Sequence, residues 1–136
     1  MQWVFDASVA MTWCFDDEKT PQTDALLERL KFEPAVVPQL WPLEVANVLV
    51  LAARRGRITQ DKCARLLSVL GALPVFVDSQ TVARAFTNIV EVAVAHRLTA
   101  YDASYLDLAR RLNLPLATLD AELRAASLAA GVRMLL

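Results

Sequence analysis

Short apolar runs typical of β-strands alternate along the chain with longer segments of helical periodicity. Helically spaced apolar residues fill the gaps between the runs, and tight two-residue hairpin signals are few. Parallel strands require long crossover connections, so this alternation predicts an α/β fold with a parallel sheet. The five expected strands are Trp3 to Phe5, Val36 to Val37, Val75 to Val77, Leu116 to Thr118 and Arg133 to Leu135.

The length of 136 residues is that of one ordinary domain, so we expect a single domain spanning residues 1–136. Hydrophobic residues make up 56% of the chain, which favours a sheet covered on both faces and a surface for self-association. We therefore expect a homodimer or a larger assembly. The formal charge of −1 gives no overall basic field, so any RNA contact must come from local patches.

The two cysteines, Cys14 and Cys63, show no C-x-x-C spacing, which indicates neither a zinc knuckle nor a disulfide framework. The longest apolar stretch, Val48 to Ala53, is far too short to span a bilayer, and no basic leader precedes a long apolar segment. We therefore expect a cytoplasmic protein with no membrane partner.

Four acidic residues occupy positions that a parallel α/β fold brings to one edge of its sheet. Asp6 directly follows the first strand-like run, and Asp120 follows the run that ends at Thr118. Glu44 and Asp102 each lie near the start of a helical segment. Ligands of open α/β sheets bind outside the carboxyl ends of the strands, so we expect the four carboxylates to meet there.

Each of these acids also has a purely structural interpretation. Asp6 and Asp120 suit the N-cap of a helix, and Glu44 suits a first helical turn because it follows a proline. Asp102 stands three residues after Thr99, as in a T-x-x-D variant of the capping box. Each structural interpretation is sufficient for one residue taken alone, but all four residues place a carboxylate on the same rim of the sheet.

A cluster of this kind requires a cation or protonation. At an effective dielectric constant near 20, carboxylates about 5 Å apart repel one another by about 3 kcal/mol per pair. Oxygen ligands select hard cations, so we predict a site for Mg²⁺ or Mn²⁺. One such ion activates water and a second stabilises the leaving oxygen, so the cluster supports phosphodiester hydrolysis without a side-chain nucleophile.

Three neutral polar residues are candidates for supporting roles. Ser8 is placed to add a hydroxyl to the site, or else simply occupies the first helical turn. Asn47 lies three residues after Glu44 in an otherwise apolar stretch, so both are expected on one buried helix face. Thr118 is expected to hydrogen-bond a metal-bound water.

Basic residues follow two of the acidic helices and form candidate RNA contacts. Their default interpretation is a solvated surface that matches the helix dipole, and the functional one is that they hold phosphates beside the metal centre. Asp107 projects from a different helical face than Asp102, so we expect it to be solvated or paired with a following arginine. The candidate arginines are Arg54, Arg55, Arg57, Arg110 and Arg111, and the expected partner of Asp107 is Arg110 or Arg111.

Four ordered motifs resemble those of the PIN-domain ribonucleases, and most closely the VapC toxins: V-F-D-A-S, P-L-E-V-A-N, L-T-A-Y-D-A-S-Y-L-D-L-A and L-A-T-L-D. The likeness covers nearly the whole chain. It implies a three-layer α/β/α fold with a five-stranded parallel sheet, Mg²⁺- or Mn²⁺-dependent RNA cleavage, homodimerisation and inhibition by a small cognate antitoxin. By match to the motifs, the acidic positions are Asp6, Glu44, Asp102 and Asp120, with Ser8, Asn47 and Thr118 in support.

Other functions fit the sequence less well. His96 is the only histidine, which excludes a ribonuclease that uses two imidazoles, and we expect it to be partly exposed near a helix end. Glycine-rich dinucleotide and nucleotide motifs are absent, and a phosphoryl-receiver domain would need a lysine late in the chain. A non-catalytic α/β binding module whose acidic rim captures a basic peptide remains the alternative.

Overall fold

A parallel sheet of four strands forms the middle layer of the protein, whose computed structural model describes residues 1–136. The strand order is β3-β2-β1-β4, so β1 and β2 are central and β3 is an open edge. The predicted parallel α/β fold is thus confirmed. The strands are β1 (Trp3–Phe5), β2 (Ala35–Val37), β3 (Val75–Val77) and β4 (Leu116–Ala117).

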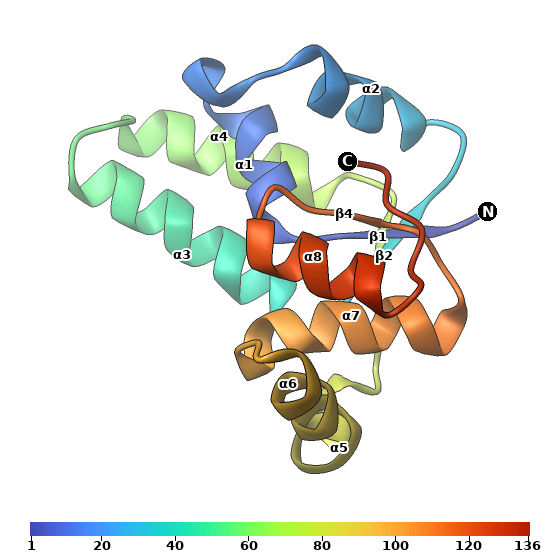
Figure 1. Ribbon diagram of the computed structural model, residues 1–136. Coiled ribbons are helices and arrows are strands. Elements are labelled where there is room, and N and C mark those ends of the chain that lie inside the picture. The colour runs from blue at the N-terminus through green and yellow to red at the C-terminus, as the bar shows by residue number, and fades with distance from the viewer.

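Helices cover both faces of this sheet, so that the molecule has three layers (Figure 1). Helix α7 packs against β1 and β4 from one side, and α1 lies on the opposite side. No helix is long and apolar enough to cross a membrane. The helices are α1 (Ala7–Cys14), α2 (Pro21–Arg29), α3 (Trp41–Arg54), α4 (Gln60–Gly71), α5 (Thr81–Arg84), α6 (Val90–His96), α7 (Ala100–Leu112) and α8 (Ala121–Ala129), with a 3₁₀ turn η1 (Asp16–Glu18) and a π-helical segment η2 (Ala85–Ile89).

The expected fifth strand is reduced to a single parallel bridge between Leu116 and Met134. The Leu116 N–H donates to the Arg133 carbonyl at 2.9 Å, and the Leu135 N–H donates to the Leu116 carbonyl at 2.8 Å. The pairing of the C-terminal segment extends no further, and strand β4 itself has only two residues. The sheet therefore has four strands where the sequence predicted five.

An aromatic cluster fixes the end of β1 against the neighbouring helices. The Phe5 ring lies 5.2 Å from the Trp3 and Trp13 rings and 5.4 Å from the Trp41 ring, measured between centroids. Aromatic rings at such distances pack favourably in tilted and edge-on arrangements. Because Asp6 follows Phe5 and Trp41 begins α3, this cluster holds the start of the acidic site in place.

Candidate active site

The first and last acidic positions follow neighbouring strands, Asp6 after β1 and Asp120 three residues after β4. Strand β1 pairs in parallel with β4, and Phe5 is the register partner of Ala117. The residues that directly follow this pair are both polar: Asp6 comes after β1 and Thr118 after β4. Both are buried, with 6% and 1% of their surface exposed.

Both carboxylate oxygens of Asp6 accept a hydrogen bond from a hydroxyl. Ser8 Oγ donates to Asp6 Oδ1, and Thr118 Oγ1 donates to Asp6 Oδ2, each at 2.5 Å. The two hydroxyls in turn accept backbone N–H groups at 3.0 Å, from Leu119 to Ser8 and from Asp120 to Thr118. Since each hydroxyl has only one proton, these N–H donors leave it directed at Asp6.

Asp6 occupies the N-cap position of α1, but its side chain makes no capping hydrogen bond. The Val9 amide lies near enough to lower the pKa of Asp6, as a weaker influence than the two hydroxyls. Burial outweighs these hydrogen bonds, so the pKa of Asp6 is raised above 3.8, and the charge of Asp120 raises it further. The capping interpretation of Asp6 is therefore wrong for its side chain.

Glu44 lies in the first turn of α3 and contacts Tyr105 of α7. The Tyr105 hydroxyl donates to Glu44 Oε1 at 2.5 Å, a length typical of a bond to an ionised carboxylate. Desolvation raises the pKa of Glu44, the Tyr105 hydrogen bond lowers it, and the nearby charge of Asp6 raises it. Tyr105 is a contact of the candidate site that the sequence interpretation missed, although it lies three residues after Asp102 on the same helix.

The remaining two acids combine a helix-start position with proximity to the site. Asp120 caps α8, since its Oδ2 accepts the Leu123 N–H at 2.8 Å. The Asp102 N–H donates to the Thr99 hydroxyl at 3.1 Å, so Thr99 caps α7 and the Asp102 carboxylate is left free. The capping interpretation is confirmed for Asp120 but does not account for the carboxylate of Asp102.

The four carboxylates act electrostatically on one another. Desolvation and the charges of Asp120, Asp6, Glu44 and also Glu122, in that order, raise the pKa of Asp102 to about 6. None of the eight ion pairs in the protein contains any of the four. Like charges gathered without a counter-ion favour either protonation or a bound cation.

The donor set fits a divalent cation, because it offers only carboxylate oxygens and the acids have no basic neighbours. The side chains are not drawn to one point, since no group of three or more acidic, histidine or cysteine side chains stands at coordination spacing. Such acids must move closer together around an ion. Asp6 and Glu44 are already oriented by hydroxyl donors, whereas Asp102 is the least constrained.

The three supporting candidates differ in their placement. Ser8 and Thr118 are bonded to Asp6 as described, so the Thr118 proton is directed to that carboxylate rather than to a water. Asn47 is exposed and has no hydrogen-bond partner, which makes the expectation of a buried Glu44–Asn47 face wrong. Helix α3 is apolar nearly all round, so its periodicity did not reveal which side is covered.

The candidate arginines also separate into bound and free groups. Arg57 pairs with Asp17 and Glu18 at 2.9 Å and stacks on Phe15, and Arg111 pairs with Asp78 at 2.6 Å. The remaining three, Arg54, Arg55 and Arg110, are exposed and are in no ion pair with an acidic side chain.

Asp107 differs from its expected surroundings. It is buried, with 7% of its surface exposed, and pairs with Arg84 through two bonds of 2.7 and 2.8 Å. The expected solvation or pairing with Arg110 or Arg111 is therefore wrong, because α5 packs its arginine onto that face of α7. His96 ends α6 and is half-buried, as expected.

The comparisons with known proteins agree on one family. The family model described as "PIN domain" matches residues 3–128. The chain is 36% identical to Ribonuclease VapC9 of Mycobacterium tuberculosis, over 88% of this chain and 87% of that protein. It is 28% identical to Ribonuclease VapC3 of Pyrobaculum aerophilum, over 90% and 92%. The crystal structure of PAE2754 from Pyrobaculum aerophilum superposes with a TM-score of 0.71 at 27% identity, covering 99% of this chain and 84% of that one.

Proposed function

Because the chain belongs to the PIN domain family, we propose that it is a metal-dependent endoribonuclease that hydrolyses RNA phosphodiester bonds as the toxin of a toxin-antitoxin pair. The observation that supports this proposal is a set of four carboxylates whose charges raise the pKa values of Asp6, Glu44 and Asp102, and none of which belongs to an ion pair. Two follow β1 and β4, and two lie in the first turns of α3 and α7. Structural ion pairs elsewhere in the same protein, such as Arg84–Asp107, show that its other buried acids are paired.

Asp6, Glu44, Asp102 and Asp120 would together hold Mg²⁺ or Mn²⁺. When bound, such an ion stabilises charge on the phosphate and lowers the pKa of water. The hydroxyls of Ser8 and Thr118 fix the direction of the Asp6 oxygens, and Tyr105 fixes one oxygen of Glu44. These contacts orient the ligands and limit their rotation, which is the usual role of groups that surround a metal site.

RNA would approach this rim through the exposed arginines that no acidic side chain neutralises. Arg54 and Arg55 end α3, and Arg110 lies in the last turn of α7. Guanidinium groups of this kind hold phosphates and position the chain without reading its sequence. Arg57 and Arg111 would contact RNA only after giving up their acidic partners, so we assign them a smaller share of the binding.

A small cognate antitoxin is the proposed protein partner. The uncompensated carboxylates that attract a cation also attract the guanidinium group of an inserted arginine, which would displace the metal and block the site. Binding of a basic segment and binding of RNA would then be mutually exclusive.

A second copy of the chain is the proposed partner of an exposed apolar row on α5, η2 and α6. Val82, Phe86, Val90 and Val94 recur at four-residue spacing, and Phe86 is 95% exposed. Residues 82–94, which carry this row, include two charges: Arg84, which Asp107 neutralises, and Glu91, which is exposed and in no ion pair. The row itself is uncharged, so it does not repel its own copy, whereas RNA or a basic antitoxin would gain nothing from its apolar side chains.

The proposed activity is tested by sequencing the 5′ ends of cellular RNA after induced expression of the wild-type chain and of Asp6→Asn. The wild type should create new 5′ ends that depend on Mg²⁺ or Mn²⁺ in the purified system and disappear with chelator. Asp6→Asn should fold and create none, while the exposed-surface variant Asp61→Asn should cut normally. A chain that binds RNA or a basic peptide equally well in chelator and never cuts would instead be a binding module.

A further inference from the structure

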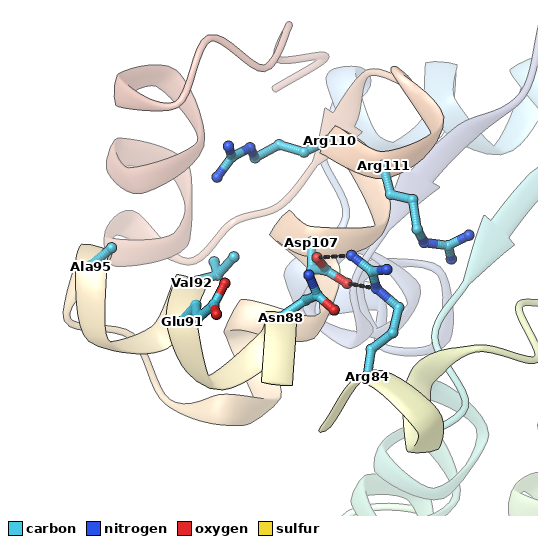
Figure 2. Close-up of a pocket in the computed structure, with 8 residues that line it drawn as sticks. All are labelled: Arg84, Asn88, Glu91, Val92, Ala95, Asp107, Arg110 and Arg111. Carbon is cyan, nitrogen blue, oxygen red and sulfur yellow. Dashed lines mark hydrogen bonds and ion pairs between the residues drawn. The ribbon is translucent and has the colours of Figure 1, made fainter. Parts of the chain in front are cut away.

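An open pocket separate from the acidic rim lies between α7 and the α5–α6 segment. Its volume is about 420 Å³, within the range of pockets that hold small molecules. Figure 2 shows Arg110 and Arg111 on α7, with the Arg111 side chain directed away from Glu91, Asn88 and Glu91 on the neighbouring segment, and the Arg84–Asp107 pair beside Asn88. Asn88 belongs to the π-helical segment η2, and such insertions in helices occur frequently at functional sites.

The charges around this pocket are of two kinds. Arg84 and Arg111 are partly buried and each is neutralised by an aspartate, Asp107 and Asp78 respectively. Arg110 and Glu91, by contrast, are exposed and belong to no ion pair. The pocket therefore presents one free cation and one free anion on facing walls.

This pattern argues against a phosphate as the occupant, because the Glu91 carboxylate would repel it. It fits a neutral, flat ligand that carries hydrogen-bond donors on one edge and acceptors on another. Val92 and Ala95 line the same wall as Glu91 and offer a small apolar surface for a ring face. An unpaired nucleobase has these properties, and single-stranded RNA is recognised through such splayed bases.

Guanine matches the two free charges better than adenine does. Its N1–H and N2–H groups donate hydrogen bonds to a carboxylate, and its O6 and N7 atoms accept a bidentate pair of hydrogen bonds from arginine. Adenine presents an acceptor at N1 and a donor at N6. Its N1 would therefore meet the acceptor oxygens of Glu91, and its N6 group would meet the donors of Arg110. Glu91 and Arg110 would therefore attract guanine on both edges and adenine on neither.

The pocket is placed to act on the same RNA strand as the acidic rim. Asp102 and Arg110 are eight residues apart on α7, which is about 12 Å along a helix axis. Where the intervening nucleotides stay stacked and only the bound base is splayed out, each advances by about 3.4 Å, so about three to four of them span this separation. We propose that the pocket binds an unpaired guanine of the RNA substrate at a fixed offset of about three to four nucleotides from the cut, an inference that rests on the proposed endoribonuclease function.

The test is cleavage of an RNA pool with a randomised single-stranded segment, followed by sequencing of the product ends. The wild type should favour guanine over adenine at one position of fixed offset. Glu91→Gln, which replaces one acceptor by a donor, should reduce that ratio about tenfold at that position alone. Arg110→Lys should reduce it similarly, because lysine keeps the charge but loses the two-pronged geometry.

The matched control is Asp61→Asn, which changes an exposed acid on α4 that does not line the pocket. This variant should keep the wild-type ratio of guanine to adenine. Absence of base preference at every offset, or a preference that survives in Glu91→Gln, would overturn the guanine pocket while leaving the nuclease intact. A ratio that survives in Arg110→Lys would reduce Arg110 to a phosphate contact and overturn its part in base reading. Absence of cleavage by the wild type would refute the proposed function itself.

A measurement without metal or catalysis gives a second readout. Guanosine added to the chelated wild-type protein should shift the backbone NMR signals of Glu91 and Ala95, whereas adenosine at the same concentration should not. Glu91→Gln should lose the guanosine response. Equal shifts with both nucleosides, or shifts confined to other parts of the protein, would contradict the proposed contacts.

Discussion

The Thr118 hydroxyl donates to Asp6 Oδ2 at 2.5 Å, which joins the polar ends of β4 and β1 across 112 residues of sequence. The same hydroxyl accepts the Asp120 N–H at 3.0 Å. One buried threonine therefore positions the first acidic residue of the site and the backbone of the last one. The register of β1 against β4 determines this contact, so the fold of the sheet and the geometry of the site are directly linked.

Thr118→Val should lower the rate of RNA cleavage about 10- to 100-fold, because it removes a donor that orients a proposed metal ligand. It should also lower the free energy of unfolding by about 1 to 3 kcal/mol, since the Asp120 N–H loses its acceptor. The matched control is Thr12→Val, another buried threonine, whose hydroxyl bonds only within α1. A similar loss of cleavage in both variants would mean that the effect comes from stability alone.

Tyr105→Phe should weaken cleavage most strongly at low pH. The Tyr105 hydrogen bond lowers the pKa of Glu44, so its removal raises that pKa and keeps Glu44 protonated to a higher pH. The acidic limb of the pH–rate profile should therefore move to higher pH. Tyr101→Phe, on the exposed side of the same helix, should leave the profile unchanged. An unshifted limb in Tyr105→Phe would show that Glu44 does not control activity.

Asp102→Asn and Asp107→Asn should change stability in opposite directions although both lie on α7. The pKa of Asp102 is raised from 3.8 to about 6 on folding, so the folded state binds more protons between these values and stability falls as pH rises through them. In chelator at pH 7.5, Asp102→Asn should be more stable than wild type by about 1 kcal/mol, allowing for partial exposure, and the gain should vanish near pH 4.

The free energy of unfolding of Asp107→Asn should instead fall by about 3 kcal/mol, because the substitution leaves the Arg84 guanidinium without its partner. Urea unfolding in chelator at pH 7.5 measures both variants. If Asp102→Asn were destabilised at pH 7.5 as well, Asp102 would be a structural residue rather than a repelled ligand.

Phe86→Asp should convert the protein from a dimer to a monomer in light scattering after size-exclusion chromatography. A charge at the centre of the apolar row would have to be buried against its own copy, which is strongly unfavourable. Phe32→Asp changes another exposed phenylalanine, 84% accessible and just beyond α2, and should leave the dimer intact. A monomeric wild type would refute this surface.

Most of the fold was predictable from local sequence because its periodicities are clear. The strands at Trp3–Phe5 and Val75–Val77 were predicted with their observed limits. The prediction of a fifth strand was wrong because an apolar run forms a strand only where a neighbour pairs with it along its length, and the C-terminal run pairs with β4 at a single bridge.

The site was predictable to the extent that it depends on strand ends and helix starts. Asp6 and Asp120 follow adjacent parallel strands, so their proximity follows from topology. The contact of Tyr105 with Glu44 joins α3 to α7 across 61 residues, and the pairing of Arg84 with Asp107 depends on how α5 docks. Such contacts between helices result from tertiary packing, which local patterns do not contain.

Calorimetric titration of Mn²⁺ into the protein at pH 7.5 tests the shared ion site most directly. Each of Asp6→Asn, Glu44→Gln, Asp102→Asn and Asp120→Asn should weaken binding at least about tenfold, and Asp120→Asn does so while keeping a residue that caps helices well. The exposed variant Asp61→Asn should bind Mn²⁺ as the wild type does. Wild-type affinity in any of the four would remove that carboxylate from the site, and wild-type affinity in all four would contradict the account.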